Sequence, residues 1–143
     1  MTAGKQIKHI VLIDDEEDCL YVTKLVLKRA GYTGKLSCFT SAKEGLGFLQ
    51  SGGDPPDLIF LDINMPGMSG FQWLSACESA GILPNGHSSV VIFSSSNRQG
   101  DVDEARGFSS VIGYVEKALT VPSFQRVVDV HSGRAHPTFD LRS

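Results

Sequence analysis

The chain has 143 residues, of which 41% are hydrophobic and 20% are charged, and its formal net charge is −3. This length suits one domain, and a chain of this size buries enough apolar surface to fold without a metal or a disulfide. The small negative charge and the lack of any Lys/Arg run exclude a general attraction to nucleic acid or anionic lipid. We therefore expect one globular domain that does not bind nucleic acid or membrane directly.

The cysteines and the N-terminal sequence indicate a cytoplasmic location. Cys19, Cys38 and Cys77 are far apart, odd in number and without metal-ligand spacing. They predict buried free thiols in a reducing cytosol. Acidic residues interrupt the first apolar run, so the N-terminus lacks the pattern of a signal peptide. No run approaches the ~20 apolar residues that span a bilayer.

Strand-like and helix-like segments alternate along the chain. Apolar, β-branched segments predict strands at residues 8–14, 35–39, 57–62, 88–96 and 110–117. Apolar residues at helical spacing predict helices within residues 18–32, 42–52, 70–80, 99–108 and 121–130. Several strands are apolar on both faces, which is typical of a parallel sheet covered by helices on both sides. With right-handed crossovers, this pattern predicts an open, doubly wound α/β sheet.

Local signals mark some of the helix ends. Ser41 followed by Glu44 matches a capping box, and Pro122 suits the first turn of the last helix. Gly100 and a thin apolar face weaken the fourth helix, so we expect raised mobility over residues 97–107.

The end of the chain has a different composition. Residues 131–143 carry Gly133, Pro137 and mixed charge, without a second apolar pattern. We expect a domain of residues 1–130 followed by a short C-terminal tail of residues 131–143.

Acidic, hydroxyl and basic side chains stand at the carboxyl ends of four expected strands. They are Asp14 and Asp15, Asp62, Ser94 and Lys117. In an open parallel sheet the strand ends meet at one edge, where ligands bind. Each residue alone is more often a turn, a cap or a solvated side chain, but the joint pattern predicts a single site.

The acids at this edge predict a metal site. Carboxylates crowded together repel one another, and a hard cation such as Mg²⁺ relieves that repulsion by taking oxygen ligands. Asp14, Asp15 and Asp62 are the candidate carboxylate ligands, and the backbone carbonyl of Asn64 is a candidate for another oxygen.

The same edge has the groups that phosphoryl transfer requires. With a metal bound, one carboxylate can attack an incoming phosphoryl group. Lys117 would neutralise one phosphoryl oxygen, and the Ser94 hydroxyl would donate a hydrogen bond to another.

Four segments of the chain fit a known signalling family. They read VLIDDEED, PDLIFLDINMPGMSGFQWL, VVIFSSS and GYVEKAL, and they lie within residues 7–130. In these segments the chain resembles the receiver domain of bacterial two-component response regulators. The resemblance implies a flavodoxin-like fold with a five-stranded parallel sheet in the order 2-1-3-4-5 and five helices.

The resemblance also assigns roles at the metal site. It implies that Asp62 accepts a phosphoryl group from a sensor histidine kinase or a histidine phosphotransfer protein, with Mg²⁺ or Mn²⁺ as the cofactor. Asp14 and Asp15 match the metal-binding acid pair. Asn64 matches the residue whose carbonyl completes the metal shell.

Three further residues match the family's switch. Ser94 matches the switch hydroxyl, Lys117 the site lysine and Tyr114 the switch aromatic. In this family the hydroxyl moves toward the phosphate and the aromatic follows it inward, which changes the surface of the fourth helix, fifth strand and fifth helix. The alternative for Tyr114 is an ordinary edge-strand aromatic with its hydroxyl in water.

These matches imply a stand-alone phosphoacceptor that is not a free-standing enzyme. No output module fits in the residues outside the matched region, so we expect the signal to reach a downstream effector protein. Dimerisation on phosphorylation stays open.

The sequence departs from the family after the fifth strand. The family usually has Lys-Pro with a cis bond there, whereas this chain has Lys117-Ala118. A cis bond costs about 2.5–4 kcal/mol before a non-proline residue, against about 0.5–1 kcal/mol before proline. We expect a trans bond, with Lys117 still reaching the site. In the long connection of residues 80–89, we expect His87 to be exposed rather than a ligand.

Other functions fit less well. A protein-binding scaffold without phosphotransfer has mild support from Ala118, but the set of site residues is complete. A haloacid-dehalogenase-type phosphatase needs Asp-x-Asp where this chain has Asp62-Ile63-Asn64, and it needs a cap domain. A flavodoxin-like cofactor binder needs a phosphate-binding loop after the first strand, where this chain places acids.

Overall fold

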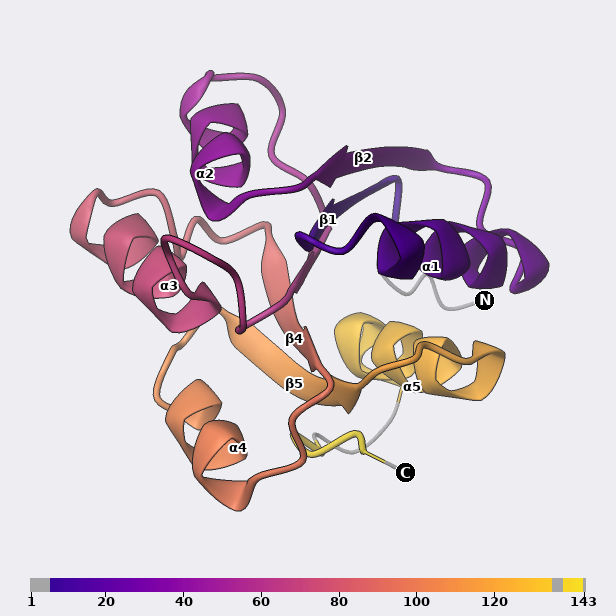
Figure 1. Cartoon of the computed structure of the whole chain (residues 1–143). Coiled ribbons are helices and arrows are strands. Elements are labelled where there is room, and N and C mark those ends of the chain that lie inside the picture. Colours follow the sequence, from indigo (N-terminus) through magenta and orange to yellow (C-terminus); the bar gives the residue numbers. More distant parts are fainter. Residues whose placement is uncertain (1–5, 135–137, 143) are drawn as a thin grey trace.

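The computed structural model describes residues 6–134 and 138–142. A parallel sheet in the order β2-β1-β3-β4-β5 lies at the centre, with helices on both faces (Figure 1). The strands are β1 (His9–Ile13), β2 (Lys35–Phe39), β3 (Leu58–Leu61), β4 (Ser89–Ser94) and β5 (Val111–Glu116). The helices are α1 (Glu17–Arg29), α2 (Ala42–Gln50), α3 (Gly70–Ser79), α4 (Gln99–Arg106) and α5 (Val121–Ser132). The predicted fold class and strand order are confirmed.

Each face of the sheet has its own apolar core. In β1, Val11 and Ile13 face the helices α2, α3 and α4, and Ile10 and Leu12 face α1 and α5. All residues of β3 are buried because helices cover both of its sides. This packing explains why the strands are apolar at successive positions, and it fixes where the strand ends point.

The cysteines are free thiols. Cys77 is buried as expected, whereas Cys19 and Cys38 are half-buried. Burial raises the pKa of Cys19 to about 11 and that of Cys77 to about 12, so both thiols stay protonated at neutral pH.

The helix ends follow the predicted signals in part. The Ser41 hydroxyl accepts a hydrogen bond from the Glu44 N–H, but the Glu44 carboxylate turns to the Thr40 N–H instead of closing the capping box. Pro122 lies in the first turn of α5, as expected.

Among the helices of residues 6–134, none combines the length and apolar character needed to cross a bilayer.

The peptide bond between Lys117 and Ala118 is cis, so the expectation of a trans bond is wrong. The local preference of a non-prolyl bond does not decide the geometry here, because contacts hold the chain on both sides. The Lys117 N–H donates to the Ser94 carbonyl at 2.9 Å, and the Thr120 side chain accepts the Ser123 N–H at the start of α5. The expectation that Lys117 still reaches the site is confirmed by its contacts there.

The expected tail has its own place in the fold. The helix α5 extends into it as far as Ser132 and ends at Gly133, whose φ of 76° suits glycine. Residues 138–142 then lie along the outer edge of β5, where Asp140 forms a parallel bridge with Tyr114 (Figure 1). The raised mobility expected for residues 97–107 stays a prediction.

Gly70 begins α3 and packs tightly against the turn after β3. A Cβ atom at residue 70 would lie 2.5 Å from the Asp62 carbonyl oxygen and 2.8 Å from the Ile63 Cα. Because both are backbone atoms that cannot easily move aside, Gly70→Ala should lower the free energy of unfolding by about 1–3 kcal/mol in urea titrations.

Gly47 provides the matched control for this substitution. It lies inside α2, and a Cβ atom at residue 47 would meet no neighbouring atom within 4 Å. Gly47→Ala should therefore raise the free energy of unfolding by about 0.5–1 kcal/mol, because alanine is the better helix former. Equal effects of the two substitutions would contradict this packing.

Candidate functional site

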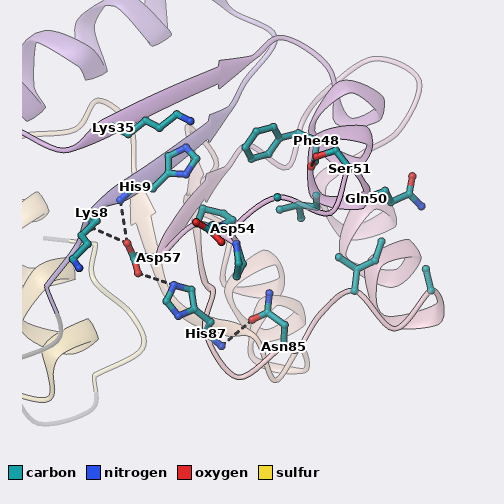
Figure 2. A pocket seen from close by; sticks show the side chains of 16 residues that line it. Lys8, His9, Lys35, Phe48, Gln50, Ser51, Asp54, Asp57, Asn85 and His87 are labelled. Atoms are coloured by element: carbon teal, nitrogen blue, oxygen red, sulfur yellow. Dashed lines mark hydrogen bonds and ion pairs between the residues drawn. The ribbon is translucent and has the colours of Figure 1, made fainter.

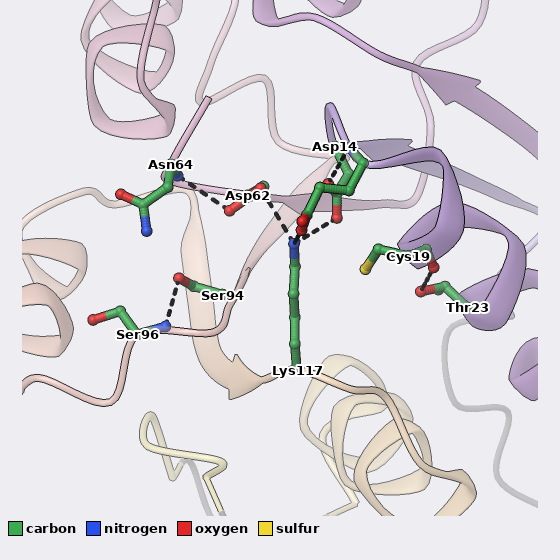
Figure 3. A network of polar contacts seen from close by, with 9 residues as sticks. Asp14, Cys19, Thr23, Asp62, Asn64, Ser94, Ser96 and Lys117 are labelled. Atoms are coloured by element: carbon green, nitrogen blue, oxygen red, sulfur yellow. Dashed lines mark hydrogen bonds and ion pairs between the residues drawn. The ribbon is translucent and has the colours of Figure 1, made fainter. Parts of the chain in front are cut away.

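The carboxyl ends of four strands bring together the side chains that the sequence singled out. Asp14 follows β1, Asp62 follows β3, Ser94 ends β4 and Lys117 follows β5 (Figure 3). Asp14 and Asp62 are only 3% and 4% exposed, and Ser94 is fully buried. The fold thus places two carboxylates, a hydroxyl and a lysine at one edge of the sheet.

Lys117 lies at the centre of this group. Its Nζ lies 2.8 Å from Asp14 Oδ2, 3.2 Å from Asp62 Oδ2 and 3.3 Å from Glu16 Oε1. Burial of the ammonium group opposes its charge, but the neighbouring carboxylates outweigh burial, and the pKa of Lys117 is raised. Lys117 is therefore a fixed positive charge between the ends of β1 and β3.

Asp62 is held through both of its carboxylate oxygens. Oδ1 accepts a hydrogen bond from the Asn64 N–H at 3.1 Å, and Oδ2 faces Lys117. Burial raises the pKa of Asp62 and the nearby Asp14 charge adds to the rise, while the Asn64 N–H and Lys117 act against it. The result is an oriented carboxylate whose negative charge is costly in the folded protein.

An acidic cluster with metal-binding geometry lies here. Among residues 6–134 and 138–142, Asp14, Glu16 and Asp62 each offer a carboxylate oxygen, and these oxygens all lie within 4.8 Å of one another. Asp14 Oδ2 is buried and accepts no well-aligned hydrogen bond, although Lys117 lies beside it. An all-oxygen donor set fits Mg²⁺ or Mn²⁺, and in this structure the Lys117 ammonium contacts the same three carboxylates.

The cluster differs from the predicted ligand set in one residue. Glu16 belongs to it, and Asp15 does not. Glu16 has an extended backbone, with φ −96° and ψ 109°, and its N–H donates to Asp14 Oδ1 at 2.9 Å. Side chains two residues apart in an extended segment point to the same side, so the spacing in the acidic run held a signal for Glu16. The metal-binding roles of Asp15 and of the Asn64 carbonyl stay predictions.

Ser94 and Tyr114 are connected through the loop after β4. The Ser94 hydroxyl accepts the Ser96 N–H at 3.1 Å, and the Tyr114 hydroxyl donates to the Ser96 carbonyl at 2.9 Å. Tyr114 is fully buried, so the alternative of a hydroxyl in water is wrong. Both predicted switch residues therefore bind the same short loop.

His87 lies at the opposite end of the sheet, beside a hollow of about 990 Å³ (Figure 2). Its side chain is 51% exposed, as expected, and its Nε2 lies 2.8 Å from Asp57 Oδ1. Asp57 Oδ2 accepts the N–H groups of Lys8 and His9. These contacts attach the connection before β4 to the start of β1, away from the acidic cluster.

Comparisons with known proteins give the family. The model of the response regulator receiver domain matches residues 10–129. The transcriptional regulatory protein YvrH of Bacillus subtilis (strain 168) is 35% identical over 135 residues, which cover 94% of this chain and 53% of YvrH. The response regulator GtcR of Aneurinibacillus migulanus is 30% identical over 94 residues, which cover 66% of this chain and 35% of GtcR. The chain thus spans about half of YvrH and about a third of GtcR.

Solved structures agree with this result. A two-component response regulator from Cytophaga hutchinsonii superposes with a TM-score of 0.78 at 26% identity, over 89% of this chain and 98% of that one. The chemotaxis protein CheY4 of Vibrio cholerae shares the fold, with a TM-score of 0.71 at 18% identity over 87% and 98% of the two chains. Because the family model spans most of the sequence and the fold agrees with it, this chain belongs to the response regulator receiver domain family.

Proposed function

We propose that Asp62 is the phosphoacceptor of a two-component signalling pathway. The phosphoryl donor is a phosphohistidine on a sensor kinase or on a histidine phosphotransfer protein, and the reaction depends on Mg²⁺ or Mn²⁺. The observation that carries the proposal is the buried Asp62 carboxylate, oriented by the Asn64 N–H and by Lys117 at the carboxyl edge of the sheet. Residues 1–130 carry this function, and residues 131–143 form the tail.

The chemistry follows from the groups at this edge. An Asp62 carboxylate oxygen attacks phosphorus, and the bond from phosphorus to the donor's imidazole nitrogen breaks with its electron pair returning to the ring. Lys117 compensates the charge on the phosphoryl oxygens at a fixed position. A metal held by the acidic cluster of Asp14, Glu16 and Asp62 would supply further charge neutralisation.

Signalling would follow from the loop after β4. The Ser94 hydroxyl turns toward the new phosphoryl group and releases the Ser96 N–H that it accepts in this structure. Because Ser96 also accepts the Tyr114 hydroxyl, the change reaches the surface of α4, β5 and α5. A downstream effector protein reads this surface, and a second phosphorylated copy is an alternative partner.

In this proposal the domain acts in the bacterial cytoplasm. The domain acts as a phosphoacceptor that assists its own phosphorylation and dephosphorylation and is not a free-standing enzyme. It has no direct contact with nucleic acid or membrane in this proposal.

Intact mass after incubation with acetyl phosphate tests the phosphoacceptor. We expect one phosphoryl adduct in the presence of Mg²⁺ and none with a chelator. Asp62→Asn should give no adduct, and Lys117→Ala should slow adduct formation by roughly 10²-fold because the fixed positive charge is lost.

Asp54→Asn is the matched control for the charge removed in Asp62→Asn. Asp54 is exposed and lies at the other end of β3, so its variant should be phosphorylated like the original chain. A folded protein that takes no phosphoryl group from acetyl phosphate or from a phosphohistidine donor would contradict the proposal and favour a binding scaffold.

The stability of the Asp62→Asn variant tests the electrostatics of the site. Because burial raises the pKa of Asp62, its charge opposes folding at neutral pH when no metal is present. With a chelator, Asp62→Asn should raise the free energy of unfolding by about 1 kcal/mol. Adding Mg²⁺ should stabilise the original chain more than the variant.

Urea titration with and without Mg²⁺ measures both effects. The exposed substitution Asp54→Asn should change stability by less than about 0.5 kcal/mol in either condition. A less stable Asp62→Asn variant in chelator would show that the contact with Lys117 outweighs the burial of the charge.

A further inference from the structure

The strand β5 is the outermost strand of the sheet, and residues 139–142 occupy its free edge. We call these residues the edge segment. The Tyr114 N–H donates to the Phe139 carbonyl, and the Leu141 N–H donates to the Tyr114 carbonyl, both at 2.9 Å. The edge segment thus continues the sheet as a short parallel strand, paired with the residue that the switch uses.

Side chains anchor the edge segment on both sides of this pairing. Leu141 is only 4% exposed and belongs to the core on the α1 and α5 side. A Cβ atom at residue 113 would lie 2.8 Å from Leu141 Cδ1, so Gly113 leaves the space that Leu141 fills. The Arg106 guanidinium lies 4.7 Å from the centre of the Phe139 ring. The edge of β5 therefore has a site for an apolar side chain as well as for a backbone.

Arg142 connects the edge segment to the loop after β4. Its guanidinium donates to the Asn97 carbonyl at 2.7 Å and to Gln99 Oε1 at 3.1 Å. It also pairs with Asp140 at 2.6 Å and lies 5.9 Å from the centre of the Tyr114 ring. Arg142 thus holds the edge segment against Tyr114 and the loop after β4.

We propose that the free edge of β5 is a strand-binding site that the chain's own edge segment fills. A partner protein would use this site by adding an extended segment, with an apolar residue in the place of Leu141 and a basic residue in the place of Arg142. Backbone hydrogen bonds from Tyr114 would hold such a strand, and the gap beside Gly113 would select its apolar residue. The partner gains access only when the edge segment leaves.

Because the edge segment belongs to the same chain, it binds the edge of β5 more readily than a free strand does. A tethered segment competes at an effective concentration of order millimolar, so free strands of weak affinity are excluded. Covering the edge also prevents unwanted strand pairing between molecules. In the resting protein, the edge segment therefore covers the free edge of β5.

The loop after β4 links this site to Asp62, and this link rests on the proposed function. Ser94 holds the Ser96 N–H, while Ser96 and Asn97 accept hydrogen bonds from Tyr114 and Arg142. A loop that moves when Ser94 turns to a phosphoryl group changes the contacts of the edge segment. By linkage, loss of the segment changes phosphorylation in return.

Hydrogen exchange at the Tyr114 amide tests the strand site directly, because this N–H points to the edge segment. Leu141→Asp puts a charge in a buried position and should speed exchange at Tyr114 at least tenfold. The amide of Val115, which points toward β4, should stay protected and shows that the sheet is intact. Thr138→Asp adds the same charge at an exposed position and should leave both amides unchanged.

A peptide with the sequence of residues 138–143 provides the second measurement. Added to the Leu141→Asp variant, it should restore protection at Tyr114 in a dose-dependent way, and a peptide with aspartate in the leucine position should not. Unchanged Tyr114 exchange in the variant, or no restoration by the peptide, overturns the strand site. If the original chain forms a dimer and the protection of the Tyr114 amide falls on dilution, the bound segment comes from a second copy. That result overturns the proposal that the chain fills its own site.

Acetyl phosphate with Mg²⁺ tests the link on the same samples, with the adduct measured by intact mass. An adduct with faster exchange at Tyr114 supports the link, and an adduct with unchanged exchange overturns it. Absence of an adduct both from acetyl phosphate and from a phosphohistidine donor overturns the proposed function and the link together. The exchange data without phosphate still decide the strand site by themselves.

Discussion

The contacts of Lys117 with Asp14 and Asp62 are the interaction on which the site depends. Two carboxylates that are almost fully buried would be costly without a partner, and the Lys117 ammonium lies within 3.2 Å of both. Because the lysine follows β5 and the acids follow β1 and β3, this compensation also fixes three strand ends relative to one another. Such an arrangement contributes little net stability after desolvation, but it keeps an oriented carboxylate at the carboxyl edge of the sheet.

The two aspartates that flank β3 have different partners. Asp57 satisfies its oxygens with two backbone N–H groups and with His87. Asp62 has one backbone N–H and the shared Lys117, and burial raises its pKa. Both Asp57 oxygens therefore have hydrogen-bond or ion-pair partners, whereas at the carboxyl end Asp14 Oδ2 is buried without a well-aligned hydrogen bond.

The sequence predicted those features that depend on local pattern. Apolar runs that stop at Asp14 and Asp62 located the strand ends, and parallel strands bring such ends together. The strand order came from the family resemblance, because local patterns do not encode which strands are neighbours. The cis bond at Lys117 was missed because contacts from β4 and α5 decide it. The edge segment was missed although Phe139 and Leu141 alternate with charged residues as in a strand, because its partner Tyr114 is distant in sequence.

The loop after β4 connects the site around Asp62 with the free edge of β5. It binds the Ser94 hydroxyl on one side and the Tyr114 hydroxyl and Arg142 on the other, so neither set of contacts is independent of the other. A neutral hydrogen bond is worth about 0.5–1.5 kcal/mol net, and bonds from a guanidinium about 1.5–3 kcal/mol. Exchanging one or two such bonds matches the coupling of about 1–3 kcal/mol that typical switches use. In the proposed switch, a phosphoryl group would change only the contacts between the loop and Arg142, while the backbone bonds to Tyr114 and the buried Leu141 side chain continue to hold the segment.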